Sequence, residues 1–151
     1  MKQKIFFWID ADITSFCIPY YLQKISDAEF YTMIDITNKP KKFFKEQKLI
    51  EFKKIWFLHE QIQNSTNFSI ENLKNYENKY DLNLWELLTN ERIFYKYNQF
   101  YNFEKNTLLS IDYQILEFFE NILNSISPDV LLTIYFVINH AVDFKKIRLN
   151  F

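Results

Sequence analysis

Short apolar runs dominate the pattern of hydrophobic and polar positions along the chain. Residues 5–9 (IFFWI) are all apolar and are mostly aromatic or β-branched. A continuous run of this length and composition is typical of a strand that is buried on both faces. Similar runs predict three further strands and a last strand near the end of the chain, at 29–37, 53–60, 130–137 and 146–151.

Segments with helical periodicity separate the first three runs. Apolar side chains from Phe16 to Ile25 recur at helical spacing. Thr14 or Ser15 can cap this helix, and Pro19 is expected in its first turn, where proline is tolerated. Residues 41–52 then have the pattern of a short amphipathic helix.

Two more helices are predicted in the second half of the chain. Ser69 is the expected N-cap of a helix over residues 70–80, and Glu71 is favourable in its first turn. Residues 106–125 form the clearest predicted element, because one apolar stripe recurs there at steps of three or four. Its members are Leu108, Ile111, Ile115, Phe119, Ile122 and Ile126.

The alternation of strands and helices predicts an α/β fold. Strands separated by helical segments form βαβ units, and these units build a parallel sheet. We therefore expect a Rossmann-like, three-layer domain over residues 1–151, with a mostly parallel sheet of four or five strands and helices on both faces. The chain shows no internal repeat, low-complexity tract or linker that would suggest a second domain.

Polar residues follow three of the predicted strands. Asp10 ends the first, Asp35 lies near the end of the second, and His59 lies near the end of the third. Parallel α/β sheets bind ligands beyond the carboxyl ends of their strands. The pattern therefore predicts that these three side chains share one edge of the sheet and face a ligand cleft.

The composition excludes several classes of function. The net charge of −1 argues against a nucleic-acid binder that relies on an overall basic field. The chain contains no glycine, so no glycine-rich phosphate-binding loop of the Walker or dinucleotide type can form. One cysteine allows no internal disulfide, and no apolar run reaches the length of a membrane span. A cytoplasmic protein is the expectation.

One short motif suggests a phosphatase. Asp10-x-Asp12-x-Thr14 after an apolar strand resembles the first motif of haloacid-dehalogenase-type phosphatases. That resemblance implies Asp10 as the nucleophile on phosphorus and Asp12 as the general acid/base, with magnesium screening the charge. The later acidic motif of that family is missing from this chain. The alternative is that both residues only end the strand and cap the helix.

Three further residues have polar side chains in apolar surroundings. Glu91 and Arg92 lie between the apolar segments LLTN and IFYKYN, which favours either a structural ion pair or an anion site. His140 lies near a predicted helix after the fourth strand and is a second candidate for the cleft. The alternative for both histidines is a structural role.

Most of the chain resembles one family. Three segments carry the likeness: residues 30–62, residues 80–103, which contain NLW and ER.FY.YN, and residues 117–133, which contain PD. They resemble the amino-terminal half of capsule or surface polysaccharide biosynthesis proteins, which are similar to glycosyltransferases with two Rossmann-like domains (GT-B). The likeness extends from about residue 4 to about residue 134 and includes no catalytic signature.

This resemblance implies a role in cell-envelope biogenesis. In that class the amino-terminal domain binds the acceptor, the carboxyl-terminal domain binds the nucleotide-sugar or CDP-polyol donor, and no metal or other cofactor is generally required. It implies a sugar or polyol-phosphate acceptor as the partner, with Asp10 or His59 as the catalytic base. Asp12, Asp35, Glu91, Arg92 and His140 become candidate binding residues.

The resemblance also implies that a donor-binding domain is missing, so we expect a truncated chain that does not catalyse transfer alone. A third hypothesis is a non-catalytic interaction domain. It rests on the high share of hydrophobic residues, 48%, part of which could form an interface.

Overall fold

The computed structural model describes residues 2–10, 13–35, 41–63, 68–84, 86 and 104–132. The described chain divides into two compact units. Unit 1 consists of residues 1–61 and 121–134, and unit 2 consists of residues 62–120 and 135–151. The predicted strand over 146–151 and most of the predicted strand over 130–137 lie outside the described residues. The single-domain expectation remains a prediction.

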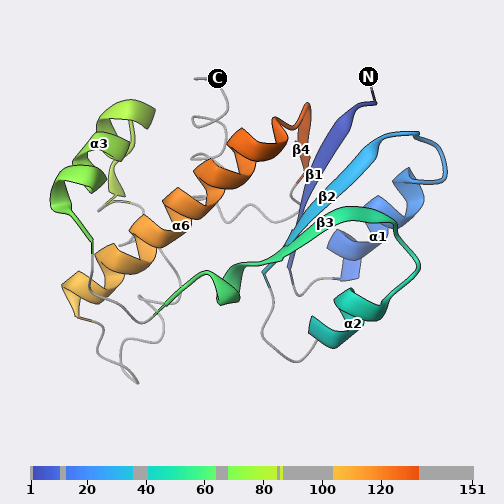
Figure 1. The fold of residues 1–151 in the computed structure, drawn as a ribbon, viewed down its shortest axis with the longest axis horizontal. Helices are drawn as coiled ribbons and strands as arrows, with labels where there is room; N and C mark the ends of the chain where they lie inside the picture. The colour runs from blue at the N-terminus through green and yellow to red at the C-terminus, as the bar shows by residue number, and fades with distance from the viewer. Residues whose placement is uncertain are drawn as a thin grey trace. The chain divides into compact units, whose positions relative to one another are not determined.

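Unit 1 contains a four-stranded sheet in which every pair of neighbours is parallel. Its strand order is β3-β2-β1-β4 (Figure 1). The strands are β1 (Lys4–Ile9), β2 (Glu29–Ile34), β3 (Phe52–Phe57) and β4 (Val130–Leu132). Helices alternate with the strands, so the fold is α/β and Rossmann-like, as the sequence predicts.

Strand β1 lies inside the sheet, which explains its continuous apolar run. All of its residues from Ile5 to Ile9 are buried. Along one face, Ile5 and Phe7 pack in a cluster with Phe30 of β2, and the rings of Phe7 and Phe30 meet edge to face at 5.1 Å. On the other face, the ring of Phe6 lies 6.2 Å from that of Trp56 of β3. A strand that packs on both faces needs apolar side chains at every position.

One buried polar side chain interrupts this pattern without leaving an unpaired group. Thr32, in the middle of β2, is fully buried. Its Oγ1 donates to the backbone carbonyl oxygen of Phe7 on the neighbouring strand, 3.1 Å away. The cost of burying the hydroxyl is therefore offset by a hydrogen bond that also joins the two central strands.

Helices α1 (Ile13–Leu22) and α2 (Lys41–Glu46) lie on one side of the sheet (Figure 1). Two crossovers that run in the same direction place their helices on the same face, because such crossovers are right-handed almost without exception. Phe16 of α1 and Phe44 of α2 complete the cluster on that face, with their ring centroids 5.8 Å apart.

The start of α1 differs from the prediction. The helix already includes Ile13, so neither Thr14 nor Ser15 is its N-cap, and Pro19 lies inside the helix instead of in its first turn. Pro19 has no N–H to donate to the carbonyl of Ser15. Its ring is buried, so packing against the sheet compensates for the missing hydrogen bond.

Unit 2 contains α3 (Ile70–Tyr80) and the larger part of α6 (Lys105–Ile126), whose last six residues belong to unit 1. Both predicted helices are confirmed. Ser69 is the N-cap of α3, because its side chain accepts from the backbone N–H of Asn72. The apolar stripe of α6 is only partly buried at its amino-terminal end, whereas Phe119, Ile122 and Ile126 are buried.

Both of these helices end on a residue with a left-handed backbone. Asp81 follows α3 with φ 52°, and Ser127 follows α6 with φ 47°. Glycine is the usual residue at this position because it has no Cβ to clash with the carbonyl oxygen. In a chain without glycine, an acidic residue and a serine occupy it instead.

We expect Phe7→Ala to lower the free energy of unfolding by about 3–5 kcal/mol, because the truncation leaves a cavity between β1 and α1. Urea unfolding followed by circular dichroism measures the change. Ile25→Ala, at a residue that is 84% exposed, is the control and should change the free energy by less than about 0.5 kcal/mol. Equal effects of the two substitutions would contradict the position of Phe7 in the core.

Candidate functional site

The parallel sheet brings the ends of β1, β2 and β3 to one edge. Ile9 is in register with Ile34, and Ile34 with Phe57. The backbone N–H of Asp35 donates to the carbonyl oxygen of Ile9, with an N···O distance of 2.7 Å. Asp10, Asp35 and His59 therefore follow strands that end at the same border. We call this border the carboxyl edge.

The strand order distinguishes the three positions. Strands β2 and β3 are added in succession on one edge of β1, whereas β4 pairs with the other edge of β1. The order therefore reverses beside β1, and open α/β sheets bind their ligands at such switch points. Asp10 is half-buried and directly follows β1. His59 follows β3, two strand spacings away, which corresponds to roughly 10 Å.

The prediction that the third strand reaches His59 is wrong. Strand β3 ends at Phe57, and Leu58–Glu60 form a short 3₁₀-helix, η1. Leu58 is buried in that helix, so the apolar run continues past the end of the strand. The turn keeps the His59 side chain near the sheet, and its imidazole lies edge to face against the ring of Phe57, at 5.9 Å.

Both ring nitrogens of His59 are buried, and neither has a hydrogen-bond partner among the described residues. An unsatisfied buried polar atom costs about 1–3 kcal/mol. Such an atom in a native structure calls for an explanation, and an unfilled ligand position is one of them. His59 therefore has an unused capacity both to donate and to accept a hydrogen bond at the carboxyl edge.

Charged side chains of α2 lie next to His59. Lys41 forms an ion pair with Glu60. The ammonium groups of Lys41 and Lys45 lie 5.4 and 5.6 Å from the centroid of the Phe57 ring. The loss of hydration, together with the charge of Lys45, lowers the pKa of Lys41. The sequence pattern does not predict this group, because the contacts join residues that are far apart in the chain.

Four of the predicted site residues lie outside the described residues. They are Asp12, Glu91, Arg92 and His140. Their roles therefore stay predictions.

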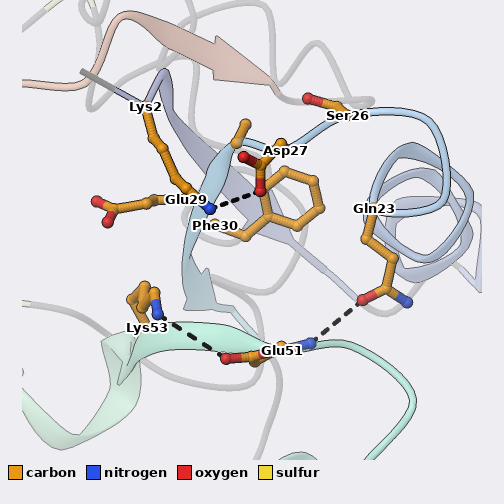
Figure 2. Close-up of a pocket in the computed structure, with 9 residues that line it drawn as sticks. Lys2, Gln23, Ser26, Asp27, Glu29, Phe30, Glu51 and Lys53 are labelled. Atoms are coloured by element: carbon orange, nitrogen blue, oxygen red, sulfur yellow. Dashed lines mark hydrogen bonds and ion pairs between the residues drawn. The ribbon is translucent and has the colours of Figure 1, made fainter.

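A pocket of about 340 Å³ lies at the opposite border of the sheet (Figure 2). It is lined by residues at the amino ends of the strands, among them Lys2, Glu29 and Glu51. Figure 2 shows two ion pairs among its charged groups. Lys2 Nζ donates to Asp27 at 2.5 Å, and Lys53 Nζ lies 3.8 Å from the Glu51 carboxylate. We call this border the amino edge.

A second polar cluster lies within unit 2. The Glu120 carboxylate accepts hydrogen bonds from Tyr76 at 2.8 Å, from Tyr80 at 2.5 Å and from the Lys79 ammonium. Burial and the hydrogen bond to Glu120 raise the pKa of Tyr76 well above its usual value and also raise that of Tyr80. The spacing of these donors along one helical face, at positions 76, 79 and 80, is a signal that sequence analysis could have used.

Burial raises the pKa of Glu120, but the hydrogen bonds from its three partners lower it more, so the pKa lies below its usual value. The cluster holds α3 against α6 within unit 2. It leaves no acidic or basic group free for catalysis, because every member is already engaged in this interaction. We therefore interpret it as structural.

The described residues contain no group of three or more His, Cys, Asp or Glu side chains that could hold a metal ion. In the same part of the chain, no helix has the length and apolar character needed to cross a membrane. No protein-family model matches the chain, and neither a curated protein nor a solved structure is significantly similar to it. The family resemblance of the sequence therefore remains an expectation.

We expect Glu120→Gln to lower the free energy of unfolding by about 1–3 kcal/mol at pH 7, because the charged acceptor of three hydrogen bonds is lost. Since folding lowers the pKa of Glu120, the stabilisation is present above the ordinary pKa of a glutamate. It disappears as the pH falls through the folded-state pKa. The difference between the native chain and the variant should therefore shrink below about pH 4.

Urea unfolding at a series of pH values measures this difference. Glu117→Gln is the matched control, since Glu117 is exposed on the same helix. A difference that stays constant between pH 7 and pH 3 would contradict the proposed role of the Glu120 charge.

Proposed function

We propose that the chain is the acceptor-binding part of a surface or capsule polysaccharide transferase of the GT-B type, which transfers a glycosyl or polyol-phosphate group. The sugar or polyol-phosphate acceptor binds at the carboxyl edge. One observation carries this proposal: three polar side chains follow parallel strands at one border, and one of them, His59, has buried ring nitrogens with no hydrogen-bond partner among the described residues. The family resemblance of the sequence supports it independently.

In this proposal Asp10 is the general base. Transfer requires that the acceptor hydroxyl loses its proton as it attacks, and a carboxylate within hydrogen-bond reach can accept that proton. Asp10 is favoured over His59 for this role because it directly follows β1, beside the reversal in strand order. Asp10 is half-buried at this edge.

His59 and Lys45 bind the acceptor. A hydroxyl or phosphate oxygen can accept a hydrogen bond from one ring nitrogen of His59, and this contact would remove the cost of the buried, unpartnered group. Lys45 supplies a positive charge 5.6 Å from the centroid of the Phe57 ring, which His59 also contacts, as a phosphate would require. These roles assign binding and proton transfer to different strands of one sheet.

We expect glycerol 3-phosphate, the simplest polyol-phosphate probe, to shift the NMR signals of residues around Asp10, Asp35 and His59. His59→Ala should weaken binding about tenfold, which corresponds to the loss of one hydrogen bond to a charged group, about 1.4 kcal/mol. Asp10→Asn should keep the affinity within about threefold, because the amide still forms hydrogen bonds. Titration by two-dimensional NMR measures all three.

The double substitution Glu51→Gln and Lys53→Ala, in the amino-edge pocket, is the matched control and should leave the affinity unchanged. The proposal is wrong if the control weakens binding while His59→Ala does not, since the probe would then bind at the amino edge.

A second candidate function rests on the position of Asp10 directly after β1. A phosphatase of the haloacid-dehalogenase type needs its nucleophilic aspartate at such a strand end, where the carboxylate can attack phosphorus. This candidate assigns the general acid/base role to Asp12.

The phosphatase candidate predicts hydrolysis of p-nitrophenyl phosphate in the presence of magnesium. Replacing the attacking oxygen in Asp10→Asn should lower the rate at least a hundredfold, whereas Asp35→Asn should have little effect. Release of p-nitrophenolate, followed by absorbance, measures the rate. No turnover by the native chain with magnesium present would exclude this candidate and leave the acceptor-binding proposal intact.

A further inference from the structure

Helix α1 is apolar on its outer side as well as on the side that faces the sheet. Its sequence, ITSFCIPYYL, contains no charged residue. Ser15, Phe16 and Pro19 are buried, whereas Ile13 is 72% and Tyr21 63% exposed. A helix that is apolar all round is normally covered on all sides. The outer side of α1 therefore lacks the cover that its composition leads us to expect.

The apolar surface continues beyond α1. In the described part of the chain, six of the seven exposed large hydrophobic side chains belong to α1, to α2 or to the turns that follow these helices. We call these six residues the α1–α2 patch: Ile13, Ile18, Tyr21, Ile25, Phe43 and Leu49.

The two helices form one surface. The ring of Phe43, which is 48% exposed, lies 5.4 Å from the ring of Phe16 in α1. Gln23, just after α1, donates to the backbone carbonyl oxygen of Leu49 at 2.5 Å. Contiguous exposed apolar surface of this kind marks an interaction site.

Lysines surround the patch. Lys42 of α2 and Lys48, just after α2, are exposed, and they are distinct from the two lysines that lie against Phe57. Lys24, after α1, is also exposed, and its ammonium lies 5.1 Å from the centroid of the Tyr21 ring. The chain as a whole has a net charge of −1, so this positive charge is a local property of the patch and not of the whole chain.

We propose that the α1–α2 patch binds the surface of an anionic lipid bilayer. Exposed Ile, Tyr and Phe side chains bordered by lysines are the combination that partitions into the boundary between headgroups and acyl chains. Each lysine near a negatively charged membrane surface adds to the attraction. A dimer in which the α2 helices of two copies face each other would bring like charges together, which disfavours that arrangement.

This inference does not depend on the proposed function, because it concerns a different surface of unit 1. The patch lies on the helical layer, whereas Asp10 and His59 follow the strands of the sheet. Membrane binding would hold the sheet, with its carboxyl edge, close to a lipid surface.

Co-sedimentation with vesicles tests the proposal. The chain should bind vesicles of equal parts phosphatidylglycerol and phosphatidylcholine at least tenfold more strongly than vesicles of phosphatidylcholine alone. High salt should weaken the binding, because it screens the attraction between exposed lysines and the anionic headgroups. Replacing two exposed apolar residues, Ile13→Gln with Tyr21→Gln, should lower binding at least tenfold, and so should Lys42→Glu with Lys48→Glu.

Two controls come from unit 2. Ile70 is 62% exposed and lies outside the patch, so Ile70→Gln should leave vesicle binding unchanged, as should Lys74→Glu for the charge. Because the substituted residues are exposed, we expect each variant to fold. Circular dichroism checks this.

The proposal fails if the native chain does not sediment with the phosphatidylglycerol vesicles, or if the unit 2 controls reduce binding as much as the patch variants do. It also fails if size-exclusion chromatography shows a dimer that Ile13→Gln with Tyr21→Gln dissociates, because the patch would then be an interface between two copies.

Discussion

Strand β1 is paired in parallel on both of its edges and buried on both of its faces, and the arrangement of unit 1 depends on this constraint. A strand in this position cannot carry a polar side chain between its ends without a buried partner. The polar residues that accompany it are therefore confined to its termini or, like Thr32 on β2, bonded to its backbone. For the same reason, polar residues such as Asp10 lie at the carboxyl edge and not within the strand.

Parallel pairing has a second consequence. Residues separated by about 25 positions in sequence arrive at one border because each crossover returns the chain to the same starting side of the sheet. The two borders then differ in character. At the amino edge the charged side chains pair with one another around a pocket, so their charge is largely neutralised within the chain. At the carboxyl edge, His59 has no partner among the described residues. A pocket and a histidine without a described hydrogen-bond partner therefore lie at opposite ends of the same strands.

The sequence predicts most of the described elements because their signals are local. The apolar run of β1, the stripe of α6 and the cap of α3 each depend on neighbouring residues. The end of β3 is missed because Leu58 continues the apolar pattern into a turn, and burial alone does not distinguish a strand from a 3₁₀-helix. Pro19 is misplaced because packing compensates for a hydrogen bond that local rules treat as essential.

The site is less predictable than the fold. Sequence periodicity identifies Asp10, Asp35 and His59 as strand-end residues, and topology then places them at one border. The approach of Lys41 and Lys45 to Phe57, the ion pair with Glu60 and the amino-edge pocket involve contacts between distant segments. These contacts depend on how helices and turns pack against the sheet, which no local pattern specifies.

The left-handed residues at the ends of α3 and α6 have a consequence for how the chain tolerates sequence change. A non-glycine residue in this conformation costs roughly 1–2 kcal/mol, so Asp81 and Ser127 hold conformational strain that the packing of each helix must offset. In a glycine-free chain the points at which helices stop are thus imposed by the surrounding structure and not by a permissive backbone. A substitution that weakens the core near α3 or α6 should therefore unfold the carboxyl end of that helix first. Local unfolding is expected to begin at these two helix ends.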